Sequence, residues 1–128
     1  MSNKPIRRWN GSAWEEIASP FELERVPFSA ALPLVLAHAG QYLYHPTSDN
    51  NARTVTIPAN SSIAFPIGTV ITIRNRINVV TVAITTDTLR LAGEDTTGSV
   101  TIAAGGIATI IKEETDSWVI SGVGVEAV

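Results

Sequence analysis

From Gln41 onward the chain alternates apolar and polar residues with a period of two, and this pattern restricts the fold more than any other feature. Successive side chains of a strand point to opposite faces of a sheet, so such alternation is typical of strands with one buried face. The segments that show it are rich in β-branched residues, which favour strands. They are residues 53–57, 69–74, 79–84, 99–103, 106–112 and 117–121.

Turn-forming residues separate these segments, and Gly105-Gly106 is the strongest hairpin signal among them. Strands that recur about every ten residues between such turns are typical of antiparallel sandwiches and barrels. We therefore predict an all-β fold, a small antiparallel sandwich or barrel-like domain over residues 41–128, with "TIAAGGIATI" as a hairpin about its two glycines. No segment has the 3.6-residue period of a helix of useful length.

Residues 1–40 differ from this pattern, and we predict that they form an N-terminal attachment arm and linker. Asn10-Gly11 favours a type I′ turn, because both central residues of that turn need positive φ. This turn predicts a hairpin in which residues 6–9 pair with residues 13–17. An isolated two-stranded hairpin is only marginally stable in water, so the arm needs a body or a partner to pack on.

Two segments lead from this hairpin to the body. Ser19, Pro20 and Glu22 have the spacing of a capping box, which predicts a short helix over residues 20–25. Prolines exclude a regular helix across residues 26–40, so we predict an extended linker that lies along a neighbouring chain. In a monomer the same residues would have to fold back over an exposed sheet face. The candidate linker or trimer contacts are the apolar residues Leu32, Leu34, Val35 and Leu36. Another candidate is Trp118, for which the core and a subunit interface both remain open.

Length and charge restrict the class of protein. The chain has 128 residues, enough for one domain with an arm. Its net charge is −3, and its 9 basic residues do not form the dense cluster that nucleic-acid binding favours. Cysteine is absent, which excludes disulfides and thiolate metal sites. The apolar stretch over residues 26–40 lies too far along the chain for a signal peptide and is too short to span a bilayer. From the charge we therefore expect no nucleic-acid partner, and from this stretch we expect no membrane partner.

Two tryptophans lie on either side of the predicted turn, in a chain with few aromatic residues. A tryptophan buries roughly 150–250 Å² when it is covered, so a pair of them is a strong anchor for a partner. Packing of the pair on the chain's own β domain is an equal alternative, and a sugar-stacking platform is a third. The candidate docking residues are Arg7, Arg8, Trp9, Asn10, Gly11 and Trp14.

We find no convincing catalytic or metal-binding pattern. His38 and His45 lack the further ligands that zinc requires, so we interpret both as surface or interface residues, with His45 at a strand end. Glu94-Asp95 and Asp116 fall in turns, where such residues satisfy the local backbone. There is no G-x-S-x-G elbow, and Gly105-Gly106 lacks the lysine of a phosphate loop. We therefore expect a chain that is not an enzyme and needs no cofactor.

Two stretches, "ANSSIAFPIGTVITIRN" (59–75) and "LRLAGEDTTGSVTIAAGGIATIIKEETDSWVISGVGV" (89–125), combine several short motifs. They are N-S-S before an apolar-Pro-apolar-Gly-Thr strand entry, an L-x-x-A-G turn, a T-G-S-x-T strand, a Gly-led strand ending in Lys, and a final D-x-W-x-I-S-G. Together they cover most of residues 60–124 and resemble a module of tailed-bacteriophage fibre, spike and head-decoration proteins. The opening "RRWNGSAW" is similar to W-N-G-x-x-W segments near the ends of phage structural proteins.

The resemblance implies a β-rich, non-enzymatic virion component that assembles as a homotrimer and is made in the host cytoplasm. In this interpretation the tryptophan hairpin docks on the major capsid protein or another virion protein, and the β module projects from it. An arm with one head domain favours a capsid decoration protein or head spike over a complete tail fibre. The alternative is a tail fibre or tail-tip component that binds a host surface receptor or glycan.

Overall fold

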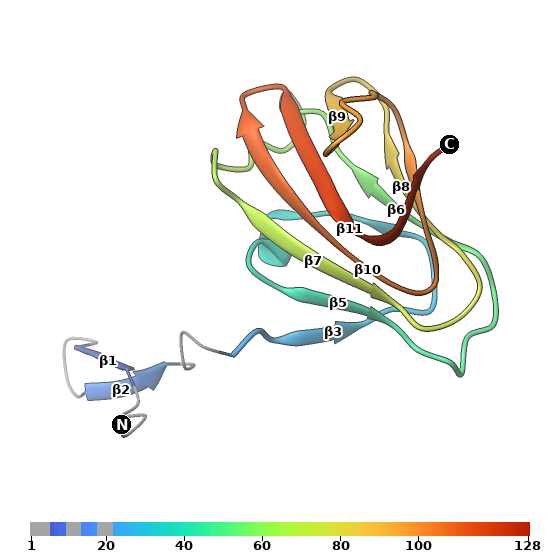
Figure 1. The fold of residues 1–128 in the computed structure, drawn as a ribbon. Helices are drawn as coiled ribbons and strands as arrows, with labels where there is room; N and C mark the ends of the chain where they lie inside the picture. Colours follow the sequence, from blue (N-terminus) through green and yellow to red (C-terminus); the bar gives the residue numbers. More distant parts are fainter. Residues whose placement is uncertain (1–5, 10–13, 18–21) are drawn as a thin grey trace.

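The described part of the chain is almost entirely β-structure. A computed structural model describes residues 6–9, 14–17 and 22–128, with side chains from Glu22 onward (Figure 1). Within these residues there is no α-helix and one short 3₁₀ helix, so the predicted all-β fold is confirmed. The elements are β1 (Ile6–Trp9), β2 (Trp14–Ile17), β3 (Arg25–Pro27), β4 (Leu32–Pro33), η1 (Leu36–His38), β5 (Tyr42–His45), β6 (Arg53–Ile57), β7 (Val70–Asn75), β8 (Val80–Ile84), β9 (Thr88–Leu91), β10 (Val100–Glu114) and β11 (Ser117–Ala127).

Strands β3 to β8 form two parallel stacks, which wind as a β-solenoid of about three turns (Figure 1). Each turn adds one strand to each stack: β3 and β4 in the first turn, β5 and β6 in the second, β7 and β8 in the third. The registers place apolar residues in columns, with Leu43 between Val26 and Ile73 in one stack and Val55 beside Val82 in the other. These columns form the hydrophobic core.

Strand β10 joins the two stacks into one nine-stranded sheet in the order β3-β5-β7-β10-β8-β6-β4. Its residues 100–102 pair antiparallel with β8, and its residues 107–111 pair antiparallel with β7. Strand β11 folds back along β10, and β9 adds to β11 in parallel over residues 117–120 (Figure 1). The last two long strands therefore close one end of the solenoid.

The predicted antiparallel sandwich or barrel is wrong. Alternation of apolar and polar residues indicates which face of a strand is buried, but it does not indicate the direction of the neighbouring strand. Here the chain passes through the opposite stack before it returns, so β5 and β7 pair in parallel, as do β6 and β8. Parallel neighbours require such long connections, whereas consecutive antiparallel strands do not.

The predicted Gly-Gly hairpin is also wrong, because β10 continues through both glycines. The pairing of β10 with β11 shifts register between Ile102 and Ile107, where β10 changes from one stack to the other. A Cβ on Gly106 would lie 2.8 Å from Ile102 Cγ2 and 2.8 Å from the Val123 carbonyl oxygen. Glycine is therefore required here because a strand bends, and not because a hairpin turns. The hairpin turn between β10 and β11 lies at Thr115-Asp116.

The predicted short helix over residues 20–25 is wrong in its described part, since residues 22–24 are not helical and Arg25 begins β3. Strands β3 and β4 both belong to the nine-stranded sheet, where β3 pairs with β5 and β4 pairs with β6. The segment predicted as an extended linker thus supplies the first turn of the solenoid. Burial of Phe28 and Leu34 in the core favours this arrangement over a free linker.

Candidate functional site

The candidate docking residues lie on a hairpin that forms its own two-stranded sheet. Strands β1 and β2 pair antiparallel, with Trp9 opposite Trp14, Arg8 opposite Glu15 and Arg7 opposite Glu16. The predicted hairpin is therefore confirmed over these strands, while Asn10 and Gly11 lie outside the described residues.

The register of this hairpin does not fit the predicted two-residue turn. A turn with Asn10 and Gly11 as its only central residues would place Trp9 opposite Ser12, but Trp9 lies opposite Trp14. The connection is therefore longer than the Asn-Gly signal alone predicts. With this register the two tryptophans lie directly opposite each other, where the side chains of an antiparallel pair come closest together.

The residues predicted as linker or trimer contacts divide into buried and exposed groups. Leu34 and Trp118 are each 1% exposed and belong to the core of this chain, so the core interpretation of Trp118 is the one that the structure favours. Leu32 is partly buried against the same core. Val35 and Leu36 are exposed, at 45% and 55%, and lie next to each other at the start of η1.

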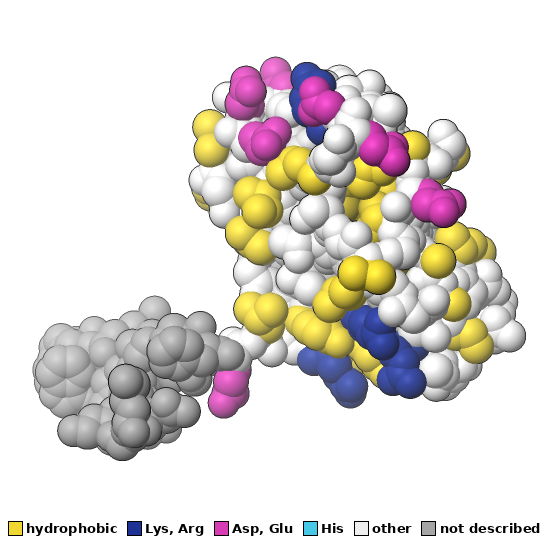
Figure 2. Space-filling view, viewed as in Figure 1, with side chains coloured by type: hydrophobic (Ala, Val, Ile, Leu, Met, Phe, Trp, Pro, Cys, Tyr) yellow, Lys and Arg dark blue, Asp and Glu magenta, His cyan; other side chains and the backbone are white. Residues whose placement is uncertain are grey.

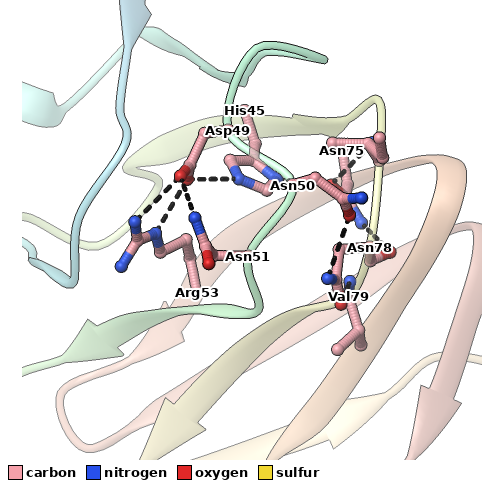
Figure 3. Close-up of polar contacts among 9 residues, drawn as sticks. His45, Asp49, Asn50, Asn51, Arg53, Asn75, Asn78 and Val79 are labelled. Atoms are coloured by element: carbon pink, nitrogen blue, oxygen red, sulfur yellow. Dashed lines mark hydrogen bonds and ion pairs between the residues drawn. The ribbon is translucent and has the colours of Figure 1, made fainter.

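A buried polar network, which we call the Asp49 network, occupies the corner where β5 and β7 end (Figure 3). His45 is fully buried, with its Nδ1 2.8 Å from Asn75 Oδ1 and its Nε2 2.9 Å from Asp49 Oδ2. Arg53 donates two hydrogen bonds to the Asp49 carboxylate, from Nε at 2.7 Å and from the guanidinium Nη2 at 2.8 Å. Asn51 donates a further bond to Asp49 Oδ1 at 2.7 Å.

Local turns bring these side chains together. The Asp49 N–H donates to the Pro46 carbonyl at 3.1 Å, which turns the chain back toward His45 at the end of β5. From the third turn of the solenoid, Asn75 donates to the carbonyls of Asn78 and Ile102, both at 2.9 Å. The Asp49 network therefore joins the second turn, the third turn and β10, and it replaces apolar packing at one corner of the core.

Both ring nitrogens of the buried His45 side chain face an oxygen atom of another side chain. Because the Asn75 amide nitrogen donates to two carbonyls, the Asn75 oxygen faces His45, and the Asp49 carboxylate faces the other ring nitrogen. Both partners are acceptors, so the ring donates to both only when each nitrogen carries a hydrogen. Our interpretation of His45 as a surface or interface residue is wrong, because its side chain is fully buried. Its predicted position at a strand end is confirmed, since β5 ends at His45. The contact with Asn75 could not be predicted, because Asn75 lies thirty residues away in the sequence.

Hydrogen bonds from Arg53, and then from Asn51, hold the pKa of the Asp49 carboxyl well below its usual range. The same contact with Asp49 raises the pKa of Arg53. The network is therefore a charged arrangement at neutral pH, and its contribution to stability depends on the ionised carboxylate.

We expect the stabilising effect of Asp49 to decrease in acid. Folding lowers the pKa of this carboxyl, so its contribution is fully present above the pKa of the unfolded group, about 4, and is lost as the pH falls further toward the folded pKa. At pH 7 the Asp49→Asn variant should unfold at a clearly lower temperature than the parent, and at pH 3 the difference should narrow. Circular dichroism melting curves measure both values.

The matched control for this experiment is Glu113→Gln, which neutralises an exposed carboxyl and should change the unfolding temperature little. A deficit of Asp49→Asn that is the same at pH 3 and pH 7 would contradict a charge-dependent role for Asp49.

A second buried polar side chain, Lys112, lies on the other side of the core at 2% exposure. Its ammonium donates to Asn60 Oδ1 at 2.5 Å and to the Phe65 carbonyl at 2.8 Å, and it lies 5.9 Å from the centre of the Trp118 ring. These bonds attach the loop between β6 and β7 to β10. Every buried polar side-chain atom of the described residues has a hydrogen-bond partner, so both buried polar groups have a structural explanation.

The remaining candidates for chemistry lie apart from one another. Glu94-Asp95 lies after β9 and Asp116 in the β10–β11 turn, and Asp95 adopts a left-handed backbone conformation with φ of 58°. His38 Nδ1 accepts a hydrogen bond from the Val35 N–H at 3.0 Å, and partial burial lowers the pKa of His38. Residues 22–128 contain no group of three or more His, Asp or Glu side chains arranged to hold a metal ion.

Neither the models of known protein families nor the curated protein sequences match this chain. Among the described residues, no helix is long and apolar enough to cross a membrane. The assignment of a function therefore depends on the residues and on their geometry.

Proposed function

We propose that the chain is a non-enzymatic structural protein of a tailed-bacteriophage particle, a short trimeric capsid decoration protein or head spike that docks through its N-terminal arm. One observation carries the proposal: among the described residues, β1 and β2 pair only with each other, and the nine-stranded sheet of the body contains neither of them. A separate hairpin with two opposed tryptophans has the composition of an attachment element.

The body supports a structural role through its construction. Its stacks are joined by β10, and its corners are held by the Asp49 network and by Lys112. These features make a stiff projection, which a decoration protein or spike requires. The resemblance of residues 60–124 to phage fibre, spike and head-decoration modules supports a phage particle as the place of such a projection.

Assembly as a homotrimer follows from the same proposal. Val35 and Leu36 are exposed neighbours on the first turn of the solenoid, and their burial against a second copy would stabilise an assembly. Three arms on one trimer raise the effective concentration for each successive contact, so a single arm needs only modest affinity for the major capsid protein or another virion protein. The assembled protein is then located on the virion after synthesis in the host cytoplasm.

We expect a Trp9→Ala/Trp14→Ala double variant to remain folded but to be lost from purified particles. Each tryptophan anchor contributes about 2 kcal/mol or more to binding, so the loss of both should reduce occupancy at least tenfold. Mass spectrometry of particles assembled with the variant measures occupancy, and light scattering of the free protein measures its oligomeric state. Glu15→Gln, on the same hairpin, is the control and should be incorporated normally. Normal incorporation of the double variant would refute docking through the arm.

The alternative function is that of a tail fibre or tail-tip component that binds a host surface receptor or glycan. It is favoured by Tyr42 and Tyr44, whose rings lie 6.1 Å apart on the outer side of β5. Cryo-electron microscopy of particles with and without the protein distinguishes the two. Density on the capsid shell supports decoration, and density on the tail supports the alternative.

A further inference from the structure

The outer face of the first stack carries a cluster of aromatic and basic side chains, which we call the tyrosine–arginine cluster. It consists of Arg25 on β3, Tyr42 and Tyr44 on β5, and Arg74 and Arg76 at the end of β7. Their positions are adjacent because Arg25 lies opposite Tyr42, and Tyr44 lies opposite Arg74. Leu43 and His45 of the same strand point inward, so the two tyrosines face outward.

The cluster is organised around the ring of Tyr44. The Arg25 guanidinium lies over this ring, 4.6 Å from its centre, and Arg76 Nη1 donates a hydrogen bond to the Tyr44 hydroxyl at 3.1 Å. The Tyr42 ring is tilted by 30° with its centre 6.1 Å away. Arg74 is held by the carbonyls of Gly105 and Gly106, where β10 bends. Several guanidinium groups and two rings are thus positioned before any partner arrives.

The guanidinium groups of this cluster have no carboxylate partner among the residues whose side chains are described. Both ion pairs of that part of the chain belong to Asp49, and Glu24, which precedes Arg25, accepts a hydrogen bond from Gln41 instead. Figure 2 shows several Lys and Arg side chains beside hydrophobic side chains at this end of the body, whereas most of the Asp and Glu side chains in the view lie at the other end, next to a further basic group. A guanidinium fork matches the oxygens of a carboxylate or sulfate group, so the cluster offers unused sites for anions.

We propose that the tyrosine–arginine cluster binds an anionic glycan, with sugar rings stacked on Tyr42 and Tyr44 and the acidic groups of the sugar bound by the arginines. Hydroxyl side chains continue from Tyr42 across the sheet, because Thr72 lies opposite Tyr42, Thr109 opposite Thr72, and Ser121 opposite Thr109. These hydroxyls suit the hydroxyl groups of a neighbouring sugar. The proposal does not depend on docking of the arm, because it concerns a different face of the chain.

Charge distinguishes a glycan from a nucleic acid. A nucleic-acid-binding domain usually has a basic stripe and a pI above 9, whereas this chain has a net charge of −3 and a pI of about 5.3. The acidic side chains at the other end include Glu113, Glu114 and Asp116, which would repel a long polyanion. A short, locally charged glycan segment can contact the cluster without crossing that end.

Fluorescence anisotropy of the full chain with labelled heparin oligosaccharide tests the proposal in solution. We expect binding at low salt that weakens about tenfold or more in Arg25→Gln/Arg76→Gln. Tyr42→Ala should weaken it several-fold without changing the charge, because it removes a stacking surface. Arg90→Gln, on β9, removes one positive charge from another part of the sheet and should retain parental affinity, whereas each single variant of the pair, Arg25→Gln or Arg76→Gln, should weaken binding.

Two results would overturn the proposal. One is unchanged heparin affinity in the double arginine variant. The other is equal affinity for heparin and for single-stranded DNA of the same charge together with no effect of Tyr42→Ala, which would indicate attraction to any polyanion. Glycan binding and docking on the particle are measured in separate experiments. A chain that does not bind heparin can still be incorporated into particles, so the failure of one proposal is distinguishable from the failure of the other.

Discussion

Replacing Trp118 with alanine should lower the free energy of unfolding by about 3–5 kcal/mol, the usual cost of removing a large aromatic side chain from a core. Trp118 is 1% exposed, and its ring packs edge to face against Phe65 at 5.5 Å. Trp118 belongs to β11 and packs against Phe65 in the loop that Lys112 holds, so the cavity would weaken the packing of this strand on that loop. Denaturant unfolding followed by circular dichroism measures the change.

The control for Trp118 lies on the same strand. Val123 is 74% exposed, so Val123→Ala should change the free energy of unfolding by less than about 0.5 kcal/mol. A loss of under about 1 kcal/mol for Trp118→Ala would contradict its place in the core.

Replacing Gly122 with alanine should destabilise the protein by about 3 kcal/mol or more, because the added carbon has no room. A Cβ at this position would lie 2.0 Å from the Ile107 carbonyl oxygen and 2.8 Å from the Ala108 Cα. Both atoms belong to the backbone of β10, so no side chain can rotate away, and the pairing of β10 with β11 must shift. Thermal unfolding measures the loss, and amide hydrogen exchange shows whether it is concentrated in these two strands.

Ser121→Ala is the matched control for Gly122, because it changes the neighbouring exposed residue of the same strand. It should alter the unfolding temperature by no more than about 2 °C. If Gly122→Ala were as stable as Ser121→Ala, the close approach of β11 to Ile107 would be refuted.

Much of the strand content could be predicted from alternation. Strand β6 begins and ends where the pattern does, β7 differs from it by one residue at each end, and β8 differs by one residue at its start. Strand β9 was missed, and of β5 only its end at His45 was predicted, because each has only four residues and follows a segment without alternation. Short strands are stabilised mainly by packing against neighbouring strands, so their own residues contain little of the alternating pattern that predicts a strand.

The path of the chain could not be predicted in the same way. A strand that bends at Gly105-Gly106 and a hairpin that turns there have the same alternating pattern, and only the pairing partners of 100–102 and 107–111 distinguish them. Parallel pairing is likewise invisible to a period of two. The spacing of thirty residues between the paired positions Tyr42 and Thr72 reflects one full solenoid turn, but it becomes meaningful only when the pairing is known.

Sequence signals between neighbouring residues predicted the N-terminal hairpin but not the Asp49 network. His45, Asp49 and Arg53 are four residues apart, a spacing that suggests a helix but here belongs to a loop between two strands. Asn75 completes the network from another turn of the solenoid. The paired strands of the N-terminal hairpin were predictable because the Asn-Gly signal and the two strands are close in sequence, although the register shows a longer connection than that signal predicts.

The path of β10 also determines the order in which a nascent chain can fold. Until residues 100–114 have left the ribosome, the β7 edge of one stack and the β8 edge of the other have no strand to connect them. Contacts between distant residues dominate the fold, and folds of this kind form slowly. The growing chain therefore exposes two open sheet edges from the completion of β8 at Ile84 until β10 emerges, and it is most prone to aggregation in this interval.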